Sequence, residues 1–218
     1  AYNRGMYNTL LFDLDGTLTD PFDGITNSVL YALKKCGIAE TDRKKLAAFI
    51  GPPLMESFQV FYGMSEGAAR RAVACYREYY ADKGIFENRV YDRIPETLAA
   101  LAARGKKLYV ATSKPEFFAE KILEHFRLAP FFSGVAGATM DETRTRKADV
   151  IAYALGRFSL PQAQSVMIGD RMHDVAGAKQ NKLPCIGVLY GFGSREELLA
   201  AGADMLAETP EALLPLLQ

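Results

Sequence analysis

The sequence predicts an α/β protein in which a parallel sheet carries an inserted all-helical domain. From residue 93 to the end, short apolar runs alternate with helical patterns, which is typical of a parallel sheet with crossover helices. The apolar run at residues 7–12 must join that sheet, because one strand alone cannot bury both of its faces. Residues 21–90, between these two segments, show helical periodicity and no strand pattern.

The segment after residue 93 supplies most of the predicted sheet. Pro95 and Gly105 bracket its first helix, since proline suits the first turn of a helix and glycine the residue beyond its end. Strands are expected at residues 7–12, 107–111, 131–138, 165–168 and 184–189. Helices are expected at residues 95–103, 115–126, 147–158, 174–181 and 209–217.

The helical block shows several apolar stripes. Ile25, Val29, Leu33 and Cys36 fall on one helical face, at spacings of three or four residues. Gly51-Pro52-Pro53 ends a second helix, and two more stripes follow it. The predicted domains are an α/β core made of residues 1–20 and 91–218, and a helical domain made of residues 21–90.

The composition is that of an ordinary globular protein. The 218 residues include 26 Lys or Arg and 26 Asp or Glu, so the formal charge is zero. Nucleic-acid binding normally requires excess positive charge, so no such partner is expected. No apolar stretch approaches the roughly 20 residues that span a bilayer, and the N-terminus lacks an apolar segment of signal length. We therefore expect a cytoplasmic protein without a membrane partner.

The three cysteines are odd in number and far apart in the sequence. This pattern argues against a disulfide framework and against a zinc site. Because Cys36, Cys75 and Cys185 all have apolar neighbours, buried free thiols are expected.

The most informative stretch is Leu10–Thr19, where an apolar run ends in Asp13 and Asp15. Ligands bind at the carboxyl ends of strands in open α/β sheets, and two such close carboxylates repel each other unless a cation or proton lies between them. A plain turn shaped by Asp and Gly is one alternative. A calcium loop is another, but it requires glycine at its sixth position and glutamate at its twelfth, where this chain has Leu18 and Gly24.

Three further polar clusters follow predicted strands or begin predicted helices. Thr112-Ser113 ends one strand, Lys147 begins one helix, and Asp170 and Asp174 flank another turn from strand to helix. Taken singly, they are typical of an N-cap, a solvated lysine and a capped turn. Since parallel strands end at one rim, together they offer carboxylates for Mg²⁺, donors for a phosphate and a balancing cation. The set predicts a phosphoryl-transfer site.

This ordered set resembles the haloacid dehalogenase (HAD) superfamily, and within it the phosphatases with a helical cap inserted after the first motif. The resemblance rests on Asp13-x-Asp15-Gly16-Thr17, Thr112, Lys147 and Gly169-Asp170-x-x-x-Asp174, which span nearly the whole chain. Thr112-Ser113-Lys114-Pro115 and Gly51-Pro52-Pro53-Leu54 are similar to stretches of the phosphoglycolate phosphatase-like branch. The resemblance implies a Rossmann-like core and a cap that closes over the site.

The resemblance also implies a role for each matching residue. Asp13 would be the nucleophile that forms an aspartyl phosphate, and Asp15 would protonate the leaving oxygen and then activate water. Thr112 would hold phosphoryl oxygens and Lys147 would balance their charge, with Arg146 as a rival for that cation. The implied Mg²⁺ ligands are Asp13, the backbone carbonyl of Asp15, Asp170 and Asp174. The expected substrate contacts are Gly16, Thr17, Ser113, Lys114, Gly51 and Pro52.

The expected function is Mg²⁺-dependent hydrolysis of a small cytosolic phosphate monoester, such as phosphoglycolate, by a monomer or homodimer. A 5'-nucleotidase or a pyrophosphatase on the same scaffold is the alternative. A sugar phosphomutase is disfavoured, because such relatives often carry a polar residue where this chain has Ile25. A dehalogenase is also disfavoured, because it would need neither Asp15 nor a metal. A non-catalytic phosphate-binding module is disfavoured because it would not need the full set of catalytic residue types.

Overall fold

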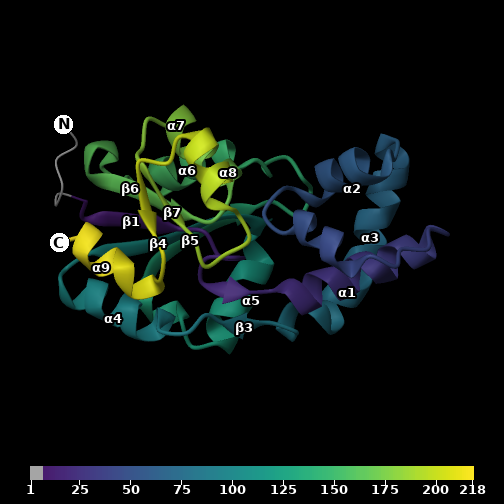
Figure 1. Cartoon of the computed structure of the whole chain (residues 1–218), viewed down its shortest axis with the longest axis horizontal. Helices are drawn as coiled ribbons and strands as arrows, with labels where there is room; N and C mark the ends of the chain where they lie inside the picture. Colours follow the sequence, from purple (N-terminus) through teal and green to yellow (C-terminus); the bar gives the residue numbers. More distant parts are fainter. Residues whose placement is uncertain (1–6) are drawn as a thin grey trace. The chain divides into compact units, whose positions relative to one another are not determined.

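A computed structural model describes residues 7–218 (Figure 1). The chain divides into two compact units. Asp20–Arg89 forms the helical unit, and the described part of Ala1–Thr19 together with Val90–Gln218 forms the core unit. Among the described residues, no helix is both long and apolar enough to cross a membrane.

The core unit is built on a six-stranded sheet whose neighbouring strands are all parallel. Its order is β5 (Phe132–Ala138), β4 (Lys107–Pro115), β1 (Thr9–Phe12), β6 (Ser165–Gly169), β7 (Cys185–Val188) and β8 (Met205–Ala207). Every residue of β1 is buried, as expected for a central strand covered on both faces. Successive strands are added on one side of β1 and then on the other, so β1 lies at the switch point where such sheets bind ligands.

Helices cover both faces of this sheet (Figure 1). One face carries α6 (Lys147–Arg157), α7 (Met172–Gln180) and α8 (Arg195–Ala201), and the other carries α4 (Ile94–Ala103), α5 (Glu116–His125) and α9 (Leu213–Leu216). On the first face, Val150, Val175 and Leu198 pack with Leu11 and Met167 of the sheet in one apolar cluster. The predicted α/β class with a parallel, Rossmann-like core is confirmed.

Some core elements differ from the sequence-based expectation. β4 continues to Pro115 instead of stopping near Ala111, so the Thr112–Lys114 stretch lies within the strand. The expected tail helix is a 3-10 turn at Pro210–Ala212 followed by the short α9. The sequence analysis missed α8 and β8, because a helix of seven residues and a strand of three are too short to establish a periodicity.

The helical unit contains three α-helices and two 3-10 helices. They are α1 (Phe22–Lys35), η1 (Arg43–Phe49), α2 (Leu54–Tyr62), α3 (Glu66–Asp82) and η2 (Gly84–Phe86). Ile25, Val29 and Leu33 are buried along α1, as their spacing predicted. Where the sequence suggested a second α-helix, the chain instead forms η1. The expectation of no strand within residues 21–90 is wrong at its end, since β3 (Arg89–Val90) pairs with β2 (Thr19–Asp20).

The cysteines are all free thiols, but their burial differs from the expectation. Only Cys185, on β7, is buried. Cys75 is half-buried and Cys36 is exposed, because Cys36 follows the last turn of α1, where the chain leaves the packed face.

Candidate active site

The centre of the sheet brings three of the predicted motifs to one rim. β1 pairs with β4 on one side, where Phe12 lies opposite Val110, and with β6 on the other, where Phe12 lies opposite Ile168. All three strands run in the same direction, so the residues that follow these positions meet at the carboxyl edge. Asp13 continues β1 there, and its backbone N–H still donates to the Ile168 carbonyl at 2.9 Å.

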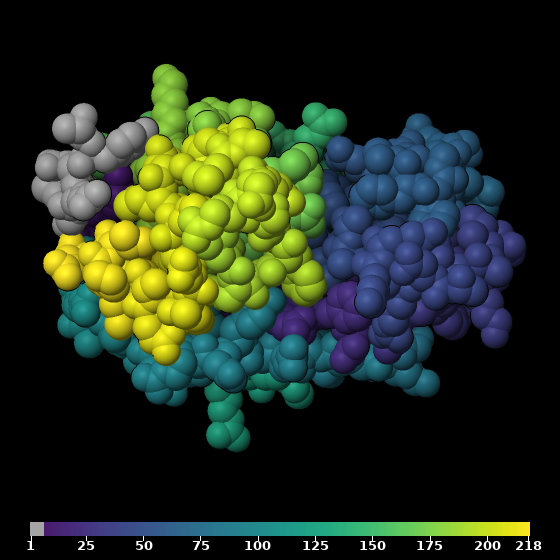
Figure 2. Space-filling view, viewed as in Figure 1, coloured from purple at the N-terminus to yellow at the C-terminus, as the bar shows by residue number. Residues whose placement is uncertain are grey.

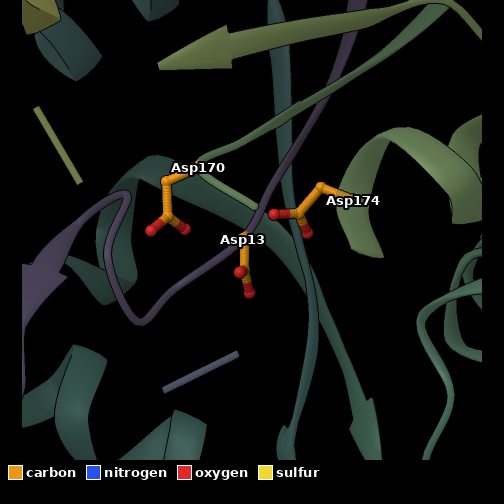
Figure 3. Close-up of side chains that lie close together, drawn as sticks. All are labelled: Asp13, Asp170 and Asp174. Atoms are coloured by element: carbon orange, nitrogen blue, oxygen red, sulfur yellow. The ribbon is translucent and has the colours of Figure 1, made fainter. Parts of the chain in front are cut away.

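Three carboxylates converge at this rim (Figure 3). Asp13 follows β1, Asp170 follows β6, and Asp174 lies in the first turn of α7. One oxygen from each lies within 4.8 Å of the others, and all three residues are buried. Buried carboxylates at such distances repel strongly, so the cluster requires protons or cations for its stability.

Lys147 supplies a positive charge to this cluster. Its Nζ lies 2.8 Å from Asp13 Oδ1 and 2.8 Å from Asp174 Oδ1, and it donates to the Ala111 carbonyl at 3.2 Å. Burial by itself lowers the pKa of Lys147, but the charges of Asp13 and Asp174 outweigh this effect and raise it above the ordinary value. Arg146, the rival cation, is exposed at the start of α6. The geometry therefore favours Lys147 over Arg146 as the cation that balances the charge of the carboxylate cluster.

The two oxygens of Asp13 have different surroundings. Oδ1 accepts from the Leu14 backbone N–H at 2.8 Å and faces Lys147 Nζ. Both of these donors use Oδ1, which leaves Oδ2 for another partner. Burial, followed by the charge of Asp174, raises the pKa of Asp13 to about 6, although Lys147 acts in the opposite direction.

Asp15 lies apart from the three-carboxylate cluster and has its own cation. Lys114 Nζ lies 2.9 Å from Asp15 Oδ2, and both side chains are at least 90% buried. Asp15 Oδ1 is buried with no hydrogen-bond partner among the described residues. Burial raises the pKa of Asp15 despite the opposing effect of Lys114. A carboxyl with a raised pKa and one oxygen without a partner is suited to carry a proton.

The turn after Asp15 packs directly against Asp170. Gly16 has φ of +84°, and a Cβ there would lie 2.2 Å from Asp170 Oδ2, so only glycine fits this position. The Thr17 hydroxyl is 3.4 Å from Asp170 Oδ1, and Thr17 is fully buried. Gly16 and Thr17, expected as substrate contacts, are thus placed against a carboxylate of the cluster.

Thr112 and Ser113 lie in the extension of β4 beside the cluster. The buried Thr112 Oγ1 accepts from the Lys114 backbone N–H at 3.1 Å, and Ser113 is half-buried. A threonine hydroxyl that accepts one hydrogen bond still has its own hydrogen to donate. These residues are strand residues and do not cap α5, whose first residue is Glu116.

The sequence and fold can be compared with known proteins at this point. The model of the family described as haloacid dehalogenase-like hydrolase matches residues 10–188, which include Asp13, Thr112, Lys147 and Asp174. The chain belongs to the haloacid dehalogenase-like hydrolases. The predictions of this superfamily and of an enzyme are confirmed.

Individual HAD relatives span nearly the whole chain. A 5'-nucleotidase of Pseudomonas aeruginosa is 52% identical over 194 residues, covering 89% of this chain and 88% of that protein. A crystal structure named as a predicted phosphatase from Clostridium acetobutylicum is 48% identical with a TM-score of 0.94, covering 96% of this chain and 97% of that one. A phosphoglycolate phosphatase of Vibrio parahaemolyticus is 24% identical over 213 residues, covering 94% and 93%.

The donor set of this HAD site fits a hard divalent cation. The site holds four buried carboxylates, those of Asp13, Asp15, Asp170 and Asp174. Lys114 pairs with Asp15, and Lys147 pairs with Asp13 and Asp174, so two ammonium groups lie among four carboxylates. Burial, and then the charges of Asp174 and Asp13, raises the pKa of Asp170 well above its ordinary value. Mg²⁺ prefers carboxylate oxygens, so the cluster has both the charge and the ligand type for it.

Gly51 and Pro52, the two predicted substrate contacts outside the core, lie in the helical unit. They form the bend between η1 and α2 and are half-buried, and Gly51 has φ of +114°. Their contact with a substrate stays a prediction.

The sequence analysis missed one group of residues that contacts Asp170 and the two turns beside it. The Phe192 backbone N–H donates to Asp170 Oδ2 at 2.8 Å, and the Tyr190 hydroxyl donates to the Thr17 carbonyl at 2.9 Å. Glu197 Oε1 accepts from the Met172 backbone N–H at 2.9 Å, at the start of α7. The Tyr-Gly-Phe-Gly run at residues 190–193 could have indicated a loop at the carboxyl rim, since it directly follows a predicted strand.

Proposed function

We propose that this HAD hydrolase is a Mg²⁺-dependent phosphatase that hydrolyses a small phosphate monoester through an aspartyl phosphate on Asp13. The observation that carries the proposal is the environment of Asp13. Its Oδ1 is held by Leu14 N–H and Lys147, its Oδ2 is left for another partner, and its neighbours Asp170 and Asp174 complete a carboxylate cluster. A bound Mg²⁺ would be held by these three aspartates and would neutralise charge on the phosphoryl oxygens.

In the first step, Asp13 Oδ2 attacks the phosphorus atom, and the bond from phosphorus to the ester oxygen breaks. Asp15 gives its proton to that leaving oxygen, so the alcohol departs neutral. The raised pKa of Asp15 supports this role, because burial favours the protonated carboxyl that the step requires. Lys147 keeps the Asp13 side chain oriented by its contact with Oδ1.

In the second step, the Asp15 carboxylate takes a proton from water, and the water oxygen attacks the phosphorus atom of the aspartyl phosphate. The bond from phosphorus to Asp13 Oδ2 breaks, which releases inorganic phosphate and restores the Asp13 carboxylate. Thr112 donates its hydroxyl hydrogen to a phosphoryl oxygen in both steps, since its acceptor side is already used by Lys114 N–H.

Nucleoside 5'-monophosphates are the first candidate substrates, and the name of one relative supports them. The 5'-nucleotidase relative is 52% identical to this chain, whereas the phosphoglycolate phosphatase relative is 24% identical. Phosphoglycolate, the expectation from the sequence motifs, is a second candidate. In this proposal residues 1–20 and 91–218 form the catalytic domain, and residues 21–90 form the cap domain of a cytoplasmic enzyme.

A substrate panel tests the proposal. Phosphate release from nucleoside 5'-monophosphates, phosphoglycolate, pyrophosphate and a hexose phosphate is measured with Mg²⁺ and with excess chelator. We expect hydrolysis in Mg²⁺, at its highest specificity constant for a nucleoside monophosphate, and loss of hydrolysis on chelation that added Mg²⁺ restores. Hydrolysis that persists unchanged in chelator would contradict the metal dependence, and isomerised sugar phosphate would indicate a phosphomutase.

The carboxylate cluster also predicts how stability depends on pH and metal. The pKa of Asp13 is raised to about 6, and those of Asp15 and Asp170 are raised as well. A carboxyl with a raised pKa binds its proton more tightly in the folded state, so the metal-free protein gains stability as the pH falls. We expect its melting temperature to rise from pH 7.5 to pH 5.5, and Mg²⁺ to raise the melting temperature most at pH 7.5.

Differential scanning calorimetry in chelator and in Mg²⁺ measures both effects. A carboxyl with a lowered pKa has the opposite effect on stability, but Glu40, the carboxyl whose pKa is lowered to about 2, does not act in this pH range. Hydrogen bonds from Lys45 and Tyr62 lower the pKa of Glu40 to about 2, so its contribution is lost only below the ordinary carboxyl pKa, outside this window. A melting temperature that falls between pH 7.5 and pH 5.5 in chelator would show that the cluster does not hold excess negative charge.

A further inference from the structure

The connection between β7 and α8 packs against Asp170 and against the Gly16 turn. We use "the 189–197 segment" for residues 189–197, which run from the end of β7 through the first turn of α8. In Figure 2 this part of the chain, coloured yellow-green, lies at the surface of the core unit. It nevertheless makes a direct hydrogen bond to Asp170 of the buried carboxylate cluster, and a second one to the Met172 backbone N–H at the start of α7.

The segment approaches Asp170 too closely for any side chain to intervene. A Cβ on Gly191 would lie 2.2 Å from the Gly16 carbonyl oxygen and 2.4 Å from Asp170 Cβ, and a Cβ on Gly193 would lie 2.0 Å from the Asp170 carbonyl oxygen. Between these two glycines, the Phe192 N–H donates to Asp170 Oδ2 at 2.8 Å. The backbone of residues 191–193 therefore sets where the Asp170 carboxylate points.

One end of the segment is fixed to the turn after Asp15. The Tyr190 hydroxyl donates to the Thr17 carbonyl at 2.9 Å, and the Tyr190 ring packs edge-on against Tyr91 with centroids 5.1 Å apart. The other end fixes the beginning of α7. Glu197 Oε1 accepts from the Met172 N–H at 2.9 Å and from Arg171 Nε at 2.8 Å.

Glu197 adds a capping acceptor from outside α7 to the start of this helix. The residue before α7 is Arg171, whose side chain is no acceptor for the first N–H groups of a helix. Asp174 accepts from the Arg171 N–H at 3.1 Å, and Glu197 accepts from the next N–H, that of Met172. Asp174 lies in the same turn, so the position of its carboxylate depends on this capped start.

We propose that the 189–197 segment is a positioning element that sets the affinity of the Asp13-Asp170-Asp174 cluster for a divalent cation, with Glu197 and Gly191 as its positioning residues. The inference rests on the proposed Mg²⁺ dependence. These residues touch neither the cation nor the substrate. They act by fixing Asp170 and the start of α7, and partners of metal ligands typically change metal affinity by about 10-fold to 100-fold when removed.

The test measures Mg²⁺ binding directly, by isothermal titration calorimetry on the metal-free full chain. We expect Glu197→Ala and Gly191→Ala each to raise the Kd for Mg²⁺ by about 10-fold or more. Glu197→Gln keeps an acceptor oxygen for Met172 N–H and should restore most of the affinity. The matched controls are Glu196→Ala, an exposed neighbour on α8, and Gly156→Ala, where an added Cβ meets open space.

The controls should keep Kd within about twofold of wild type, as expected for surface changes away from the site. At saturating Mg²⁺, the KM of Glu197→Ala for p-nitrophenyl phosphate should equal that of wild type, because only metal affinity is altered. A Glu197→Ala protein that binds Mg²⁺ with wild-type Kd overturns this inference alone. A wild-type protein that binds no Mg²⁺ overturns the proposed function as well, so the two failures are distinguishable.

Discussion

Asp13→Asn is expected to lower phosphate-ester hydrolysis by about 10⁵-fold or more, the scale seen when a catalytic nucleophile is removed. Asparagine keeps the shape of the side chain, and its Oδ1 still accepts from Leu14 N–H and Lys147, which now contact the aspartate oxygen. It replaces Oδ2, the oxygen assigned to the attack, with an amide nitrogen. The measurement is kcat under saturating Mg²⁺, together with acid-quench trapping of a phosphoenzyme from labelled substrate.

The fold should tolerate this change, so the loss can be assigned to chemistry. Removing one negative charge from a crowded carboxylate cluster relieves repulsion, and the metal-free variant should melt no lower than wild type. Asp149→Asn is the matched control, since Asp149 is exposed in the first turn of α6 and should keep wild-type kcat. An Asp13→Asn protein that still forms the phosphoenzyme would disprove the assignment of the nucleophile.

Lys147→Met is expected to lower kcat by about 10³-fold and to destabilise the metal-free fold by about 3–5 kcal/mol. The methionine side chain has a similar length but no charge, so Asp13 and Asp174 lose the cation that lies 2.8 Å from each. Breaking a buried ion pair leaves uncompensated charge, which is the origin of the stability loss. Denaturant unfolding in chelator and steady-state kinetics in Mg²⁺ measure the two effects separately.

Arg146→Met is the control for this prediction and a test of the rival cation. Arg146 is exposed one residue before Lys147, so its removal should change the free energy of unfolding by less than about 0.5 kcal/mol. Its kcat should stay near that of wild type. The reverse pattern, with Arg146→Met inactive and Lys147→Met active, would transfer the charge-balancing role to Arg146.

The strand ends were predictable from sequence because they combine two independent patterns. Leu10, Leu11 and Phe12 read as a buried strand, and the acids that follow are too polar to continue it. The same change from apolar to acidic residues marks Asp170 after β6. Parallel strands end at one rim, so the convergence of these residues followed from topology alone.

The pairing of individual cations and carboxylates was not predictable in this way. Lys114 was expected to contact substrate, which stays a prediction, and nothing in the sequence indicated that its Nζ would lie 2.9 Å from Asp15 Oδ2. Lys147 and Arg146 are adjacent in sequence, but Lys147 is the buried first residue of α6 and Arg146 is the exposed residue with extended backbone just before it. Sequence-based helix boundaries are uncertain by one or two residues, so the residue at which α6 begins, and with it the side chain that is buried, could not be predicted.

The sequence by itself determined the α/β core with its helical insertion, and it predicted which motifs follow the strands at the carboxyl rim of that core. The reason is that the periodicity of apolar residues and the change to charged residues can be read from consecutive positions. Only the tertiary structure decided which oxygen of Asp13 remains available, and that Glu197 and the 190–193 backbone hold Asp170 and α7. Those contacts join residues more than 20 positions apart at distances near 3 Å, and no local pattern in a sequence specifies a position that finely.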